Sequence, residues 1–220
     1  MSRLLLAASF VTVAVYSFAS ADRVAPIGHW AKPPIAGVAN PQADVLDRAV
    51  VRTKLAANRA ANLARFRAYQ KAGVFPNNTY GDSARNVWLD EDGHLCAAAT
   101  IIKASGKADL VARTAEQNNF IRLVDVTQGP LFDWILTSGL TKAEIVAIQE
   151  IMMPVTEQPE PDSPEPRIVD GGMRKRENQR LLGVYRRVDA SIVANQQRSL
   201  ELAVDRLLAN PVLARQLLDG

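Results

Sequence analysis

The stretch PQADVLDRAVVRTKLAANRAANLARFRAYQKAG, residues 41–73, carries the strongest fold signal in the chain, because it has the composition and spacing of one long helix. Asn40 and Pro41 match an N-cap followed by proline at the first helical position. The apolar residues that share one helix face are Val45, Ala49, Leu55, Ala56, Leu63, Phe66 and Tyr69. Gly73 supplies a left-handed C-terminal residue, so the stretch predicts a basic helix of about 30 residues.

A second long helix is expected in residues 173–220, covering about 173–209. Its apolar positions at helical spacing are Leu181, Val184, Val188, Ile192, Leu200, Val204 and Leu207. Asn210 and Pro211 then begin a final short helix. Residues 154–172, which precede the long helix, are acidic and rich in proline, a composition typical of an extended, solvated linker.

Residues 74–153, between the long helices, predict a compact module of short helices. Asp90-Glu91-Asp92-Gly93 is a strong turn signal, and its flanks allow at most one small β-hairpin. Thr141 and Glu144 form a capping box at the start of the last helix. The expected helices span residues 96–104, 108–118, 130–136 and 141–153. The large aromatic residues expected in the core are Phe75, Tyr80, Trp88, Phe120, Phe132 and Trp134.

The fold class is therefore mainly α, with the module flanked by two long amphipathic helices that are expected to pair antiparallel. Charge follows the same division. Residues 41–73 hold seven basic against two acidic residues and residues 173–220 nine against five, whereas residues 74–153 hold six against ten. The basic ends either dock on the acidic middle or bind an external polyanion. Nucleic acid is not an expected partner, because its binding usually demands a concentrated basic surface and a net charge of +3 does not point to one.

Residues 1–21 have the features of a cleavable signal peptide. Arg3 provides a positive start, Leu4–Phe18 is apolar, and Ala19-Ser20-Ala21 fits the small residues before a cleavage site. The apolar run is shorter than the about 20 residues that span a bilayer, which favours cleavage over a retained N-terminal anchor. The mature chain is expected in the periplasm or the medium, with residues 22–40 as a flexible, Pro- and Gly-containing tether.

The middle of the chain also carries a set of short motifs. They are Phe75-Pro76, Asp92-Gly93-His94-Leu95-Cys96-Ala97, Ser105-Gly106, Leu110-Val111, Asn118-Asn119, Trp134, Ser138-Gly139-Leu140-Thr141, Glu144 and Ile148-Gln149. With this set, residues 74–150 resemble a group of uncharacterised exported bacterial proteins common in GC-rich soil and predatory bacteria, myxobacteria among them. The resemblance implies export and a compact helical module, and it implies no activity.

Cys96 and His94 are the sharpest candidates for catalytic chemistry. A nucleophilic thiol needs a base within hydrogen-bond reach and a group that orients the base, and Asp90 or Asp92 could orient His94. The alternatives are a buried structural cysteine and an interchain or redox thiol. Burial is favoured, because an apolar segment follows Cys96 directly.

Asp90 and Asp92 also raise the question of a metal site. Placing Gly93 at the sixth position of a calcium loop puts Trp88 at the first position and Ala99 at the twelfth, where carboxylates are needed. The motif fails at both ends, so a solvated turn is favoured. The chain has one cysteine and two histidines, too few for a structural zinc site. No metal and no cofactor are expected.

These observations favour a non-enzymatic protein of the envelope or the medium. Its amphipathic helices would bind an unidentified protein partner or a second copy of the chain. The first alternative is a thiol-dependent enzyme that uses Cys96 with His94. The second is binding of an anionic lipid surface or envelope polysaccharide by the basic helices.

Overall fold

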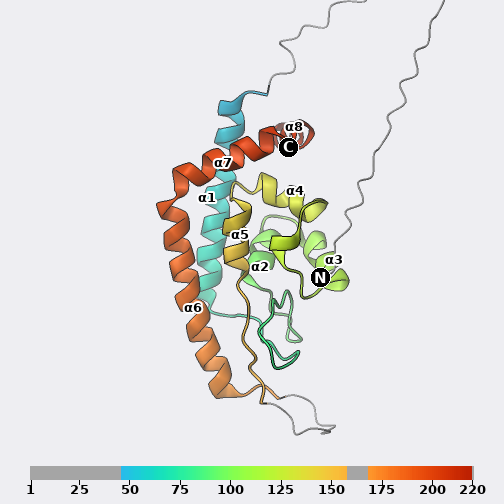
Figure 1. Ribbon diagram of the computed structural model, residues 1–220, viewed down its shortest axis with the longest axis vertical. Coiled ribbons are helices and arrows are strands. Elements are labelled where there is room, and N and C mark those ends of the chain that lie inside the picture. The colour runs from blue at the N-terminus through green and yellow to red at the C-terminus, as the bar shows by residue number, and fades with distance from the viewer. Residues whose placement is uncertain (1–45, 158–167, 220) are drawn as a thin grey trace, which may run out of the picture. The chain divides into compact units, whose positions relative to one another are not determined.

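The computed structural model describes residues 46–157 and 168–219, and the fold is mainly α-helical (Figure 1). Within these residues there are eight α-helices and one short 3₁₀ helix, and β-structure is limited to isolated bridges. The predicted signal peptide 1–21, the tether 22–40 and residues 158–167 of the linker lie outside the described residues. Among the helices described, none combines the length and the hydropathy needed to cross a membrane.

Helix α1 spans Arg48–Ala72. The predicted helix start near Pro41 is wrong for Leu46 and Asp47, the two described residues before α1, because neither is helical. The Asp47 carboxylate accepts a hydrogen bond from the Ala49 N–H at 2.7 Å and satisfies one of the free N–H groups of the first turn. The predicted end is confirmed, because Gly73 closes the helix with φ +64°. The buried residues of α1 are Val51, Leu55, Arg59, Asn62, Leu63, Phe66 and Tyr69.

The second long helix is interrupted, and the prediction of one continuous helix over 173–209 is wrong. Helix α6 spans Gly171–Ala194 and α7 spans Gln196–Leu208, with non-helical Asn195 between them. The Asn195 side chain donates to the Ser191 carbonyl at 2.8 Å, which stabilises the bend. The bend lets the apolar face of α7 pack against the first half of α1. The final short helix α8 spans Pro211–Asp219, as predicted.

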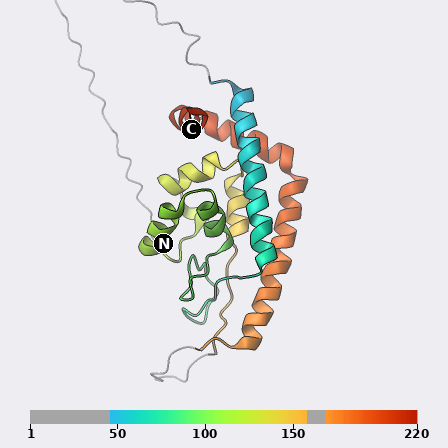
Figure 2. The same cartoon turned by 180° about the vertical axis from the view of Figure 1, so that it is seen from behind.

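Helices α1 and α6 lie side by side and run in opposite directions in both views, which confirms the expected antiparallel pairing (Figures 1 and 2). Arg67 of α1 contacts Asp189 of α6 at 3.0 Å. Near the other end of α1, Arg48 reaches Asp205 of α7 at 2.6 Å. The long helices thus make ion pairs with each other as well as with the acidic middle, where Arg180 of α6 pairs with Glu150 at 2.8 Å. Such exposed pairs orient the helices but contribute little to stability.

The module contains the four short helices predicted for it. They are α2 (Ala97–Ala104), α3 (Ala108–Gln117), α4 (Pro130–Thr137) and α5 (Lys142–Gln149). A 3₁₀ helix over Leu123–Asp125 is present in addition. The capping box of Thr141 and Glu144 at the start of α5 is confirmed. Only the predicted end of α5 at Met153 is wrong. Glu150 has φ +29°, and the backbone of Met152 pairs instead with that of Arg85 at 2.9 and 3.1 Å.

Two predicted extended regions differ in detail. The small hairpin is a single bridge between Leu89 and Leu95. The linker 154–172 is only partly solvated at its described ends. Glu157 and Ile168 are exposed, but Val155 and Thr156 are buried, and the Val155 carbonyl accepts a hydrogen bond from the Asp170 N–H at 2.8 Å. Backbone pairing with neighbouring segments satisfies the polar groups that a linker would expose to water.

The main hydrophobic core lies between the module and the long helices. The Tyr185 ring of α6 contacts the rings of Phe66 and Tyr69 of α1 and of Phe75, which follows α1. Tyr69 also contacts Phe75, and the ring centroids in these edge-on and tilted pairs are 5.2–5.7 Å apart. Of the six aromatic residues expected in the core, Phe75, Trp88 and Trp134 are buried. Tyr80 and Phe132 are half-buried, and Phe120 is exposed and lies under the Arg85 guanidinium.

Arg59 is a buried charge at the centre of α1 and contacts three other segments. Its guanidinium donates to both carboxylate oxygens of Glu144 at 2.9 and 2.7 Å. It also donates to the carbonyls of Gly139 at 3.2 Å and of Ile192 at 3.0 Å. One side chain therefore joins α1 to the α4–α5 turn, to α5 and to the end of α6.

Gly139, in the α4–α5 turn, makes the close approach to α1 that this arrangement needs. A Cβ at this position would lie 2.1 Å from the Leu55 carbonyl oxygen and 2.7 Å from the Arg59 nitrogen. Both are backbone atoms of a rigid helix and cannot turn aside. With φ +77°, the residue also occupies the left-handed region that favours glycine.

Gly139→Ala is therefore expected to lower the free energy of unfolding by about 3 kcal/mol or more, since it adds overpacking to left-handed strain. Gly106→Ala is the matched control. Gly106 has φ +88° but no atom within 4 Å of an added Cβ, so only the strain of about 1–2 kcal/mol applies. Urea denaturation of both variants measures the difference, and equal losses would contradict the close packing of the turn on α1.

The Glu144 carboxylate should make stability depend on acid pH. Burial alone would raise its pKa, but the hydrogen bonds from Arg59 and from the Thr141 N–H hold the pKa of Glu144 below its ordinary value. A group whose pKa is lowered by folding stabilises the fold above its unfolded pKa of about 4.3, and this contribution is lost as pH falls through the folded pKa. Glu144→Gln removes the effect and leaves Arg59 buried without its anion.

We expect Glu144→Gln to cost about 3–5 kcal/mol near pH 7. The difference in free energy of unfolding between the variant and the wild type should stay constant down to about pH 5 and become smaller below about pH 4.3. Urea denaturation at several pH values between neutral and acid measures the gap, with exposed Glu116→Gln as the control. A gap that does not change with pH would show that the Glu144 charge does not contribute.

Candidate functional site

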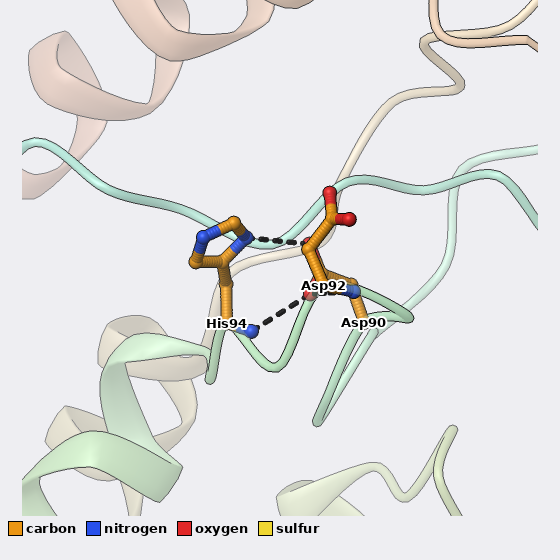
Figure 3. A group of neighbouring side chains, drawn as sticks. All are labelled: Asp90, Asp92 and His94. Atoms are coloured by element: carbon orange, nitrogen blue, oxygen red, sulfur yellow. Dashed lines mark hydrogen bonds and ion pairs between the residues drawn. The ribbon is translucent and has the colours of Figure 1, made fainter.

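The turn over residues 90–94 brings together three of the predicted site residues, as Figure 3 shows. Asp90 is buried and accepts four hydrogen bonds. Its Oδ1 accepts from the N–H groups of Asp92 at 3.1 Å and His94 at 2.7 Å. Its Oδ2 accepts from the Asn77 N–H at 2.9 Å and lies 3.0 Å from His94 Nδ1. Asp90 therefore acts as the internal brace of the turn.

Asp90, Asp92 and His94 each offer a possible metal ligand atom, and these atoms lie within 4.8 Å of one another. A metal ion would have to compete for the Asp90 oxygens with the hydrogen bonds that already occupy them. Asp92 is exposed, and its carboxylate makes one long contact, at 3.4 Å, with the Asn77 side chain. The geometry fits a structural turn, and the cluster gives no support to a metal site.

Cys96 lies two residues after His94 but faces another environment. It is 1% exposed, it is the N-cap of α2, and its Sγ accepts a hydrogen bond from the Ala99 N–H at 3.4 Å. Burial raises the pKa of the Cys96 thiol to about 12, so the reactive thiolate is scarce at neutral pH. The His94 ring is bound to Asp90. A thiol-dependent reaction at Cys96 has no support in this geometry.

Native Cys96 should react at least about tenfold more slowly with N-ethylmaleimide than the unfolded chain, because only the exposed thiolate reacts. Mass spectrometry of samples taken at intervals, with and without guanidinium, measures both rates. With a pKa of about 12, the native rate should rise between pH 7 and pH 10 without a plateau. The unfolded chain, whose thiol has an ordinary pKa near 8.5, serves as the control and should level off. A native plateau below pH 9 would indicate an activated thiol.

A different feature, far from this turn, is an open cleft of about 660 Å³ among α1, α4, α8 and the segment that begins α3. We call it the cationic cleft. Lys54 and Arg65 of α1 line it, together with Lys107 and Arg113 of the α3 segment. None of these four cations forms an ion pair within the part of the chain that the structure describes. Asp133 is the one acidic residue among those lining the cleft.

The walls of the cationic cleft are held by hydrogen bonds between α1 and the end of α4. The side-chain amides of Asn58 and Asn62 donate to the carbonyls of Thr137 at 2.8 Å and Ser138 at 2.9 Å. These carbonyls belong to the last turn of α4, where they lack partners within the helix. Trp134 of α4 also lines the cleft.

The electrostatics of the cationic cleft favour an anion. Four cations and one carboxylate face the same concavity, and walls of low dielectric constant concentrate their positive potential. A volume of about 660 Å³ lies within the range of cavities that hold small molecules. Lys107 and Arg113 are exposed, whereas Lys54 and Arg65 are half-buried. Because none of the four forms an ion pair within the described residues, no such pair has to be broken when a ligand binds.

The sequence analysis did not find this cleft. Its residues come from four segments between positions 54 and 217, and each segment alone has the pattern of an ordinary solvated face. One local pattern in the sequence does point to this face of α1. Lys54, Asn58, Asn62 and Arg65 follow one another at intervals of three or four residues, which places polar side chains on one stripe of α1.

Comparison of the chain with family models, with curated proteins and with solved structures found no match in any of the three.

Proposed function

We propose that this chain is an exported, non-catalytic binding protein that holds a small anionic ligand in the cationic cleft. The observation that carries the proposal is the convergence on one cavity of Lys54, Arg65, Lys107 and Arg113, none of them in an ion pair within the described residues. Export is supported by the apolar segment Leu4–Phe18 and the small residues that follow it.

The packing of the long helices favours the cleft over the helix faces as the binding surface. The apolar face of α1 packs against α6 through Phe66 and Tyr185, and against α7 through Leu55 and Val204. The faces that could have received a protein partner or a second copy are thus used inside the chain. What these helices present to solvent is mostly charged and polar.

The shape of the cleft favours a small ligand over a long polymer. Helices bound the cavity on several sides, and the cations gather around it rather than along an open stripe. A polymer that binds by charge alone needs a continuous basic surface. The acidic residues Glu201 and Asp205 beside Arg48 interrupt the basic charge outside the cleft.

Isothermal titration calorimetry with three anions tests the proposal. The probes are 1-anilinonaphthalene-8-sulfonate, pyrophosphate and dextran sulfate. We expect saturable binding of at least one small anion, with one site per chain, and weaker binding as salt is added, because partly exposed charges are screened. The Lys107→Gln/Arg113→Gln variant should bind about tenfold more weakly, since it loses two exposed charge contacts.

The matched control is Lys175→Gln/Arg186→Gln, which removes the same charge from exposed positions of α6 away from the cleft. It should bind like the wild type. The proposal fails if no probe binds, or if both double variants weaken binding equally, because binding would then follow net charge only. Binding of dextran sulfate alone would favour the polymer interpretation instead.

A further inference from the structure

We infer that the ligand of the cationic cleft is an amphipathic organic anion, with one acidic group at the α3 end of the cleft and an apolar body toward α8. This inference depends on the proposed function and names the class of ligand. It follows from the separation of the two ends, from the leucines of α8 and Trp134 in the lining, and from the use already made of most of the neutral polar groups.

The two ends of the cleft are chemically different. Lys54 and Arg65 are eleven residues apart on α1, which corresponds to about 16 Å along the helix axis. Helices α8, α4 and α3 follow one another along α1 in both views (Figures 1 and 2). Lys54 therefore lies toward α8, and Arg65 lies toward Lys107 and Arg113 of the α3 segment. Three of the four cations are gathered at that end.

The α8 end of the cleft carries apolar surface beside the polar side chain of Gln216. Leu213 and Leu217 of α8 line the cleft and pack beside the cluster that contains Val51 and Leu55 of α1. Both leucines are only half-buried, so they keep apolar surface open to the cavity. Partly exposed apolar surface in a concave site is a common feature of pockets that receive apolar ligand groups.

Trp134 of α4 also lines the cleft. Its indole Nε1 donates to the Ser105 Oγ at 2.9 Å, which fixes the ring and uses its only donor. The residue is 7% exposed, so it offers only a small apolar surface to the cavity. Trp134 is therefore suited to apolar contact with a ligand and not to hydrogen bonding.

Most neutral polar side chains of the cleft make hydrogen bonds within the protein, and exposed Gln216 of α8 is the exception. The Asn58 amide donates to the Thr137 carbonyl, and the Asn62 amide donates to Ser138 while its Oδ1 accepts from Arg65. The Ser105 hydroxyl donates to the Ile102 carbonyl at 2.7 Å as well as accepting from Trp134. A ligand rich in hydroxyl groups, such as a sugar, would find few free partners and would lose hydrogen bonds to water.

A pair of related dyes tests the inference. 1-Anilinonaphthalene-8-sulfonate and N-phenyl-1-naphthylamine share the same ring system, and only the first carries an acidic group. Fluorescence titration of the wild type should show one site per chain, with the sulfonate bound at least about tenfold more tightly than the neutral dye. Pyrophosphate, which has charge but no apolar body, should not displace the sulfonate at millimolar concentration.

Leu217→Gln should weaken binding of the sulfonate at least about fivefold, because it makes the α8 end polar. Exposed Leu202→Gln on α7, outside the cleft, is the matched control and should bind like the wild type. Circular dichroism and thermal melts check that both variants fold. If Leu217→Gln does not fold, Leu213→Gln replaces it in the same comparison with Leu202→Gln.

The outcomes separate this inference from the proposed function. Displacement of the dye by pyrophosphate, with no effect of the leucine substitution, overturns the inference and leaves anion binding in place. If the two dyes bind with equal affinity and Lys107→Gln/Arg113→Gln does not change that affinity, both the inference and the proposed function are overturned. The expected result is that the affinity for the dye depends strongly on its sulfonate group, on Lys107 and Arg113, and on Leu217.

Discussion

The buried guanidinium of Arg59 is the constraint on which the rest of the structure depends. A charge removed from water must be compensated by an anion and by hydrogen bonds, and Arg59 finds both in segments that are distant in the chain. Glu144 supplies the anion and also accepts the Thr141 N–H in the capping box of α5. The same carboxylate thus caps one helix and neutralises another, so α1 and α5 cannot shift independently.

This arrangement also shapes the cationic cleft. Asn62, one turn along α1 from Arg59, binds the end of α4, while Gly139 lets the chain after α4 pass directly over α1. Helix α4 carries Trp134, which lines the cleft. The buried polar face of α1 therefore holds the scaffold together, and the neighbouring face, with Lys54 and Arg65, remains open to a ligand. Binding surface and stabilising contacts thus share one helix, and Asn58 and Asn62 belong to both.

Caps and breakers predicted the short helices well, because their hydrogen bonds join residues three or four positions apart. Thr141 with Glu144 is one such case, and Gly73 at the end of α1 is another. The errors arose where a distant segment competed. Met152 leaves the helical pattern of α5 to pair with Arg85, and the bend at Asn195 lets α7 pack on α1.

Reactive side chains lie close together in sequence in residues 90–94 and at Cys96, and this pattern predicted a candidate site. The hydrogen bonds of Asp90 and the burial of Cys96 instead indicate a structural role for both. By itself the sequence determined the helices, their caps and the mainly α fold, since these depend on local hydrogen bonds and periodicity. Only the tertiary structure decided that Arg59 meets Glu144, 85 residues away, and that cations of α1 and α3 face one cavity. The physical reason is that such contacts depend on how helices pack, which no local pattern records.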